Sequence, residues 1–402
     1  MKKNISSRIA KWMSLAGAAA VAMPAGLHAE EHGNAEGLEP VLSSVSDLQL
    51  KGSFGAEFGA SSSNRNRGLG PTQNYHTFNI SHLRLGIEGD VHDDFQFDTV
   101  LSLLPSVAAG GTVINDLGGE GAGVNLYHAT LTYSGLDFVD LSVGYEFPRF
   151  GMEAYAHDED LITITRSVLS TTLRPSQHTG VSAHGDWDIF DYRVGVYNSE
   201  ADGSANQSGS YPNSYLFNLS GGVDLDEYVR AIHDDLSADL RADFIYNDEA
   251  GTTNTAELYK NAFALGTNIE FMDVNVAYEY IWARSTAPGP RPRVQGYILT
   301  PSYFITDDLQ AVVRYERVRN TEGSTAGSTL LGHNAYAADV QGVPAAAAGN
   351  KYQALYLGSN YYMYEDRLKL MGGIELAELR DTEGANTQSR THTLMTAVRM
   401  QF

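Results

Sequence analysis

The sequence of 402 residues contains no cysteine, and only 19% of its residues are charged. The absence of cysteine excludes a small scaffold held by disulfides, while 40 glycines and 23 tyrosines indicate a large ordered β protein rather than a disordered chain. Basic residues are scarce, because 27 Lys and Arg stand against 49 Asp and Glu, for a formal net charge of −22. We therefore expect no nucleic-acid partner.

Long apolar runs are also missing, apart from one near the N-terminus. Four basic residues precede an apolar run at 13–23, which is followed by Pro24 and by the small residue Ala29. This layout predicts a signal peptide over 1–29, since the run is too short for a membrane anchor. Without that segment the chain has 23 basic and 49 acidic residues and a net charge of −26. Residues 30–49 are then predicted to form a periplasmic N-terminal segment.

The rest of the chain shows repeated alternation of apolar and polar residues, the signature of β-strands. In the segment 80–90, Leu83, Leu85 and Ile87 fall on one face and polar side chains on the other, and 236–246 repeats the pattern. No later stretch is apolar enough for a transmembrane helix. If the protein spans a membrane, it must do so as a closed barrel, because lipid leaves no other way to pair every backbone N–H and C=O.

Sixteen such segments, an even number, predict an antiparallel barrel over residues 50–402. Short connections such as 92–94 alternate with long ones such as 60–78 and 320–350, which is typical of short periplasmic turns and long outer loops. A soluble β-sandwich would also alternate along its strands, but it has no reason to put every long loop at one end. The predicted strands are 50–59, 79–91, 95–104, 124–134, 138–147, 179–187, 190–198, 215–225, 235–246, 261–271, 273–283, 294–305, 309–319, 352–363, 368–380 and 390–402.

Aromatic residues near strand ends support the same architecture. Tyr278, Tyr280 and Trp282 share one face at the loop end of a predicted strand, and Tyr145 with Phe147 are predicted to lie similarly in an aromatic girdle. The chain also ends in an alternating strand that closes on an apolar Phe402, a pattern similar to the C-terminal signal of bacterial outer-membrane barrels.

Two local motifs carry a family resemblance. They are Leu83-Arg-Leu-Gly-Ile-Glu-Gly89 before an acidic turn, and Leu141-Ser-Val-Gly-Tyr-Glu-Phe-Pro-Arg-Phe-Gly-Met-Glu153 followed by Arg166-Ser167 and Arg174-Pro175. The chain resembles the phosphate-selective porin family of the O and P type. The resemblance implies a homotrimer of sixteen-stranded barrels in the bacterial outer membrane that passes phosphate or other small anions without a cofactor.

The long connection at 148–178 is predicted to fold into the pore and narrow it, since a barrel of this size otherwise leaves a wide aqueous channel. Fixed charges in such a passage attract ions of the opposite sign. The predicted constriction residues are Arg149, Arg166, Arg174, Glu153, Asp158 and Asp160. The charged residues predicted to face the lumen from the strands are Arg84, Glu88, Asp239, Arg241 and Asp243.

The sequence leaves several functions open. A preference for anions follows from the family resemblance, and a non-selective or cation-preferring porin is the alternative. An outer-membrane barrel enzyme and a secreted β-sandwich binding protein are alternatives of other classes, although no Gly-x-Ser-x-Gly, His-Glu-x-x-His or Walker motif is present. Outer-membrane lipid and lipopolysaccharide are the expected partners besides the solute, and the arginines that could steer anions to the mouth or hold lipid phosphates are Arg65, Arg67, Arg284, Arg291 and Arg293.

Overall fold

The computed structural model describes most of the chain after residue 45. The described ranges are 46–65, 73–92, 94–103, 107–108, 112–113, 124–199, 215–248, 259–284, 293–320, 350–364, 366–381 and 386–402. The predicted signal peptide at 1–29 lies outside the described residues, as do Arg67 and Arg291. Within the described ranges, no helix is both long and apolar enough to cross a membrane.

Sixteen strands of the described chain form one closed antiparallel barrel in which each strand pairs with its neighbours in sequence. They are β1 (Ser46–Arg65), β2 (Gln73–His92), β3 (Phe95–Ser102), β6 (Asn125–Tyr133), β7 (Asp140–Glu146), β8 (His178–Trp187), β9 (Phe190–Asn198), β10 (Tyr215–Asp224), β11 (Leu236–Asn247), β12 (Asn261–Phe271), β13 (Val274–Arg284), β14 (Arg293–Phe304), β15 (Leu309–Asn320), β16 (Lys351–Met363), β17 (Leu368–Asp381) and β18 (Asn386–Gln401). A separate hairpin of β4 (Val107–Ala108) and β5 (Thr112–Val113) lies between β3 and β6.

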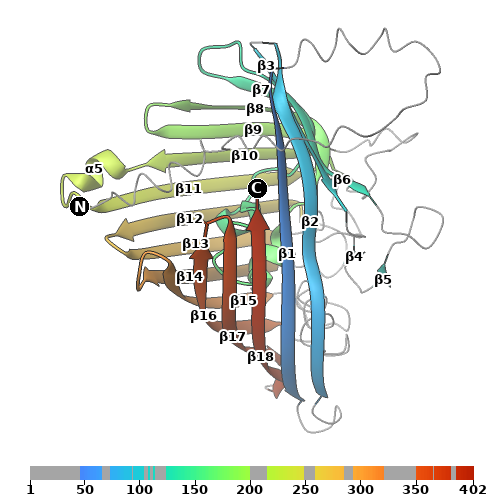
Figure 1. Cartoon of the computed structure of the whole chain (residues 1–402), viewed down its shortest axis with the longest axis vertical. Helices are drawn as coiled ribbons and strands as arrows, with labels where there is room; N and C mark the ends of the chain where they lie inside the picture. Colours follow the sequence, from blue (N-terminus) through green and yellow to red (C-terminus); the bar gives the residue numbers. More distant parts are fainter. Residues whose placement is uncertain are drawn as a thin grey trace.

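The barrel closes where the first strand meets the last. β1 and β18 run side by side in Figure 1, with Phe54 opposite Met400 in the antiparallel register. The backbone N–H of Gly52 donates to the carbonyl oxygen of Phe402 at 2.9 Å, and the N–H of Phe402 donates back at 3.0 Å. Closure removes the free strand edges that lipid could not satisfy.

All sixteen predicted strands are confirmed, and the largest differences in their bounds occur at β1, β2 and β18. β1 begins before residue 50 and continues to Arg65, where its polar end pairs with the polar start of β2, as in Ser61 opposite Tyr75. The extensions at 60–65 and 386–389 lack apolar alternation. Backbone pairing does not require that alternation beyond the lipid, so periodicity underestimated these strands.

The two faces of each strand differ as the alternation predicts. Leu85 and Ile87 are exposed on the outside of β2, whereas Arg84, the residue before Leu85, is buried on the inside. In β11, Leu240 and Phe244 are exposed and Asp243 is buried. The outward side chains therefore form an apolar band on the outside of the barrel.

The predicted outward placement of aromatic side chains is confirmed for the three residues on β13. It is wrong for Phe147, the residue that follows β7. Tyr278, Tyr280 and Trp282 alternate with the buried inward side chains Glu279 and Ile281. The ring of Phe147, by contrast, lines the interior cavity. β7 ends at Glu146, so the alternation that put Phe147 on the outside no longer applies there.

One turn at the short-connection end is longer than the others and contains a helix that sequence reading did not predict. Helix α5 (Asp226–Arg230) lies between β10 and β11 (Figure 1). The Asp226 carboxylate accepts hydrogen bonds from the Ser237 hydroxyl at 2.5 Å and from the Ala238 N–H at 3.1 Å. These bonds tie the turn to the start of β11.

Gly144 in β7 offers a test of the fold. Its φ is +155°, and a Cβ placed there would collide with the backbone carbonyl of Ala129 on β6. We expect Gly144→Ala to lower the free energy of unfolding by about 1–3 kcal/mol. The measurement is the temperature at which the folded barrel loses its compact gel migration. The control is Gly372→Ala, because a Cβ at Gly372 meets no atom within 4 Å; equal transitions for both variants would contradict the prediction.

Candidate functional site

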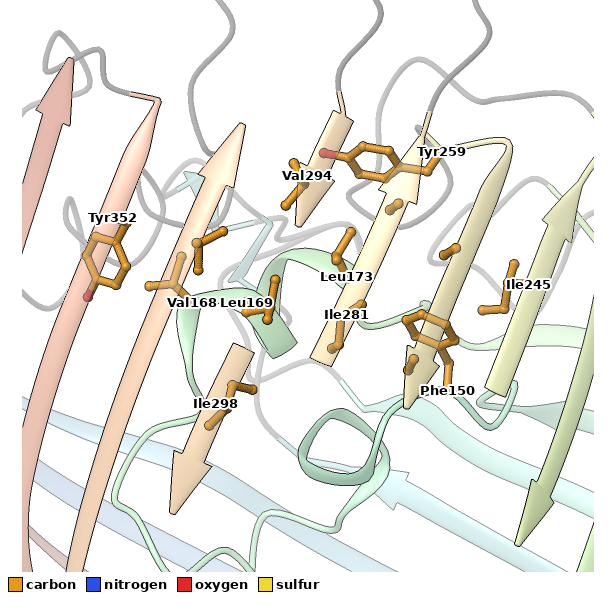
Figure 2. Packing of buried hydrophobic residues seen from close by; sticks show 14 of the residues in the cluster. Phe150, Val168, Leu169, Leu173, Ile245, Tyr259, Ile281, Val294, Ile298 and Tyr352 are labelled. Atoms are coloured by element: carbon orange, nitrogen blue, oxygen red, sulfur yellow. The ribbon is translucent and has the colours of Figure 1, made fainter. Parts of the chain in front are cut away.

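The segment between β7 and β8, residues 147–177, lies inside the barrel. It contains two short helices, α3 (Met152–Tyr155) and α4 (Val168–Leu173). Phe150, Leu169 and Leu173 from this inner loop are fully buried and belong to one apolar cluster with inward side chains of the wall, including Ile245 and Ile281. Figure 2 shows these side chains gathered between the loop and the strands. Apolar residues on the inward faces of β11 to β16 therefore hold the loop against one side of the lumen.

Carboxylates of the wall hold the start of the inner loop. The Gly151 N–H donates to Asp243 Oδ2 at 2.8 Å. The Met152 N–H donates to Glu279 Oε1 at 2.6 Å, and the Glu153 N–H donates to Glu279 Oε2 at 3.3 Å. Since the first N–H groups of a helix have no partner within the helix, these two wall carboxylates satisfy donors of α3 that would otherwise be orphaned.

A buried arginine on β15 links the middle of the inner loop to the wall. Arg314 is 1% exposed and donates to Glu153 Oε1 at 3.0 Å, to Glu375 Oε2 at 3.1 Å and to the Thr163 hydroxyl at 3.0 Å. Glu153 also accepts from the N–H and the hydroxyl of Ser167, at 3.0 and 2.5 Å. Burial alone would raise the pKa of Glu153, but Arg314 and the serine hydrogen bonds outweigh it and lower the pKa.

Two cations of the last strands bind the main chain of the inner loop. Lys369 on β17 donates to the carbonyl oxygens of Glu159 and Leu161, at 2.8 Å each. Arg399 on β18 donates to the carbonyls of Leu161 at 3.1 Å and Thr163 at 3.3 Å. Both side chains are buried. Their charge therefore stabilises the loop rather than meeting a solute.

The tip of the inner loop reaches the opposite wall through an ion-pair network. Asp158 pairs with Arg84 on β2 and with Arg166 of the loop, and Arg84 also lies 3.5 Å from Glu159. Burial would raise the pKa of Asp158, but the two guanidinium groups outweigh it and hold that pKa well below its usual range. Asp158 is thus a buried anion that joins β2 to the loop.

Arg149 lies on the other side of the loop, away from the tip. Its guanidinium donates to Asp191 Oδ2 on β9 at 2.9 Å, and Arg241 on β11 lies 3.2 Å from Oδ1 of the same carboxylate. Asn218 Nδ2 donates to the Arg149 carbonyl at 2.7 Å. This group fixes the loop to β9, β10 and β11.

The space left open is a cavity of about 1370 Å³ between the inner loop and the wall formed by β1, β2, β3 and β6 to β8. Arg84 lies over the ring of Tyr127 at 3.9 Å, and Arg174 lies over the ring of Phe147 at 4.3 Å. The two rings are 5.4 Å apart. Among the described residues, Arg174 has no carboxylate within ion-pair distance, and its guanidinium donates to the Tyr127 hydroxyl at 3.5 Å.

The predicted site residues therefore divide into two groups. Arg84, Glu88, Arg174 and Asp160 line the cavity, and burial raises the pKa of Asp160 in the loop. Arg149, Glu153, Asp158, Arg166, Arg241 and Asp243 make anchoring contacts between the loop and the wall or within the loop. Asp239 shares the inward face of β11 with Arg241 and Asp243.

Sequence reading missed Arg314, Glu279, Lys369 and Arg399, which hold the inner loop. Each of them is a charged residue at an inward position of a strand, and that position in the sequence was the feature that could have identified it. Tyr127 and Phe147 were missed as lining residues, since only charged residues were predicted to line the pore and Phe147 was assigned to the outward aromatic girdle. In the part of the chain that the structure describes, no group of three His, Cys, Asp or Glu side chains is placed to hold a metal ion.

Replacement of Arg314 tests its anchoring role. Arg314→Met would leave Glu153 and Glu375 as buried anions without their guanidinium partner, and breaking a buried pair in this way costs about 3–5 kcal/mol. We expect faster hydrogen–deuterium exchange at the amides of 151–169 and a lower unfolding temperature. Arg390→Gln is the control, since Arg390 is exposed on β18. Unchanged exchange in the loop would contradict the assignment.

The lowered pKa of Asp158 predicts that the protein loses stability in strong acid, when this carboxylate takes up a proton. A lowered folded-state pKa stabilises the protein fully above the ordinary aspartate pKa, and this stabilisation is lost as the pH falls through the lowered value. We expect Asp158→Asn to reduce the melting temperature at pH 7 and to flatten its further decline under strong acid. Circular dichroism melts at a series of pH values measure both effects. Parallel curves for the variant and the parent chain would refute this prediction.

Comparisons with known proteins agree with the geometry. The family of phosphate-selective porins O and P matches residues 48–402, and no curated protein matches the chain. Among solved structures, an anion-selective porin from Comamonas acidovorans has a TM-score of 0.55 and 14% identity, covering 89% of this chain and 99% of that one. OprB of Pseudomonas putida, in a high-pH structure, has a TM-score of 0.55 and 11% identity, covering 90% and 96%.

A third similar structure is OmpT of Vibrio cholerae, folded in vitro and described as a trimer form, with a TM-score of 0.50, 12% identity and coverage of 88% and 99%. At these identities the structures establish a shared barrel fold. The family match is broader evidence, because it runs from β1 to the C-terminus. The chain belongs to the phosphate-selective porin O and P family, and it is a channel of the bacterial outer membrane rather than an enzyme.

Proposed function

We propose that this porin passes small hydrophilic solutes by diffusion and prefers anions such as phosphate. The observation that carries the preference is the pair of guanidinium groups on the cavity wall, Arg84 over Tyr127 and Arg174 over Phe147. Arg84 is partly neutralised by ion pairs with Asp158 and Glu159, whereas no carboxylate among the described residues lies within ion-pair distance of Arg174, which Asp158 influences only from farther away. A solute that enters the cavity therefore meets a guanidinium group that no described carboxylate pairs with directly.

The chemistry of arginine suits this role. Its planar guanidinium donates two hydrogen bonds at once to an oxyanion and stays charged at every physiological pH. Because each guanidinium stacks on a ring by its flat face, the N–H groups at its edge still point away from the ring and can donate hydrogen bonds. Stacking also limits the motion of both side chains. A cation held between the inner loop and the wall raises the local concentration of anions and repels cations.

The comparisons add support from outside the chain. The matched family is described as phosphate-selective, and one protein with the same fold is described as an anion-selective porin. Another structure with this fold is a trimer form, so we extend the proposal to a homotrimer with the cavity in each barrel. The exposed apolar band on the outside supports outer-membrane lipid as the surrounding partner.

The balance of charge in the cavity favours a second candidate. Nine carboxylates and five Lys or Arg are among its described lining residues. Asp307, Asp308 and Asp366 in this set come from the short turns, at the end of the barrel opposite the long loops. An acidic entrance attracts cations, so a non-selective or cation-preferring porin is the alternative. The two candidates differ in whether the wide entrance or the Arg174 region controls passage.

Reversal potentials of the full chain in planar bilayers under a potassium chloride gradient separate these candidates. We expect an anion-selective potential and a weaker selectivity in Arg174→Gln, because this change removes the cavity guanidinium that no described carboxylate pairs with directly. The control is Arg230→Gln, which removes one charge from helix α5 outside the lumen, where Arg230 pairs with Asp226 at 2.7 Å. Phosphate added to one side should reduce chloride current more in the parent chain than in Arg174→Gln.

Two results would contradict the proposal. A cation-selective potential in the parent chain would establish the second candidate. An anion-selective potential that is equal in the parent chain, Arg174→Gln and Arg230→Gln would place the selectivity outside the Arg174 region.

A further inference from the structure

Basic residues on the outer face of the barrel gather on β13 to β18, at the end that carries the long loops. Arg317 and Arg319 are exposed on β15, where the alternate residues Glu316 and Val318 are buried toward the lumen. The same alternation places the rest of the set outside. Its members are Arg284, Arg293, Arg317, Arg319, Lys351, Arg380 and Arg390, which we call the outer basic patch.

The strand register brings like charges of this patch directly opposite one another. Arg284 pairs with Arg293, Arg319 pairs with Lys351, and Lys351 pairs in turn with Arg380. Like charges in directly opposed positions destabilise a sheet. Five neighbouring strands, β13 to β17, therefore present a row of positive charge that an anionic ligand would stabilise.

Carboxylates pair with two residues of the patch, Arg380 and Arg390. Glu378 on β17 pairs with Arg380 at 2.6 Å and with Arg390 at 3.0 Å. Within the described residues, no carboxylate lies within ion-pair distance of Arg317, Arg319 or Lys351. The centre of the outer basic patch therefore keeps its full charge in a chain whose net charge is strongly negative.

Below the patch, the same strands expose an aromatic and aliphatic surface toward lipid. The rings of Tyr278, Tyr297 and Tyr315 follow one another across β13, β14 and β15, with centroids 6.3 and 6.0 Å apart. Farther from the loops, Leu357 and Ile374 are 46% and 47% exposed. The order from the loop end is thus cations, then tyrosines, then aliphatic side chains.

The patch is confined to one side of the barrel. In β6 to β12 the basic residues are Arg193 and Arg241, and both point inward to pair with Glu146 and Asp191. Lys260, just before β12, lies over the ring of Tyr246. General attraction to an anionic membrane surface would not require such a one-sided arrangement, which indicates a local site.

We propose that the outer basic patch binds a phosphorylated, acylated lipid of the outer leaflet, namely lipopolysaccharide. The phosphates of the lipid lie against Arg317, Arg319 and Lys351, and its acyl chains cover the tyrosines and aliphatic side chains below. Arginine donates pairs of hydrogen bonds to phosphate oxygens, and the acyl chains continue the contact that the outward face makes with lipid. This site rests on the placement in the outer membrane and is independent of the ion selectivity of the pore.

The test uses the full chain refolded without lipopolysaccharide and a bis-phosphorylated, acylated lipid A as the probe. Its binding is titrated by native mass spectrometry in detergent. The patch variant combines Arg317→Gln, Arg319→Gln and Lys351→Gln, and the matched control combines Arg230→Gln, Lys260→Gln and Arg367→Gln. We expect the patch variant to bind about a hundredfold more weakly, because each basic residue near an anionic lipid surface contributes to binding, and the control to bind as the parent chain does.

Further arms of the experiment separate the sources of phosphate. Lipid A without its phosphates should bind far more weakly to the parent chain, and millimolar inorganic phosphate should fail to displace intact lipid A. Equal binding by the patch variant and the control, equal binding of the phosphate-free lipid, or full displacement by inorganic phosphate would each overturn the proposal. Compact gel migration verifies that both variants fold, and their reversal potentials report on the pore separately.

Discussion

The requirement that lipid leaves no backbone group unpaired governs this structure. It forces the strands into a closed ring, and closure is made by the antiparallel pairing of β1 with β18, which ends in the exchange of backbone hydrogen bonds between Gly52 and Phe402. A closed ring of this size encloses more space than wall side chains can fill. The inner loop fills part of that space, so its packing is a consequence of closure rather than a separate domain.

The barrel could be predicted from the sequence because each strand carries its own alternating pattern. That pattern is local, and it fixes which side chains face lipid. The attachment of the inner loop could not be predicted in the same way. The bond between Arg314 and Glu153 joins residues far apart in sequence, and no local pattern shows that a charged residue on one strand will meet a distant loop.

The predicted constriction residues illustrate this difference. All six lie in the inner loop, but their composition did not reveal which of them contact the cavity. Arg149 and Arg174 are chemically equivalent in the sequence, yet Arg149 pairs with Asp191, whereas Arg174 rests on the ring of Phe147. The number of charged residues in the loop therefore predicts the selectivity of the pore poorly. What matters is which of them, like Arg174, form no ion pair with the described part of the wall.

The contacts of Lys369 and Arg399 with loop carbonyls have a consequence for the electrostatics of the whole channel. These cations belong to the wall, but the loop backbone covers them and offers its own side chains to the water instead. The inner loop therefore separates these two wall cations from the water of the channel. A change in loop sequence that kept the backbone path could alter the charge of the channel without any change in the barrel, so this porin can acquire a new preference while its fold stays the same.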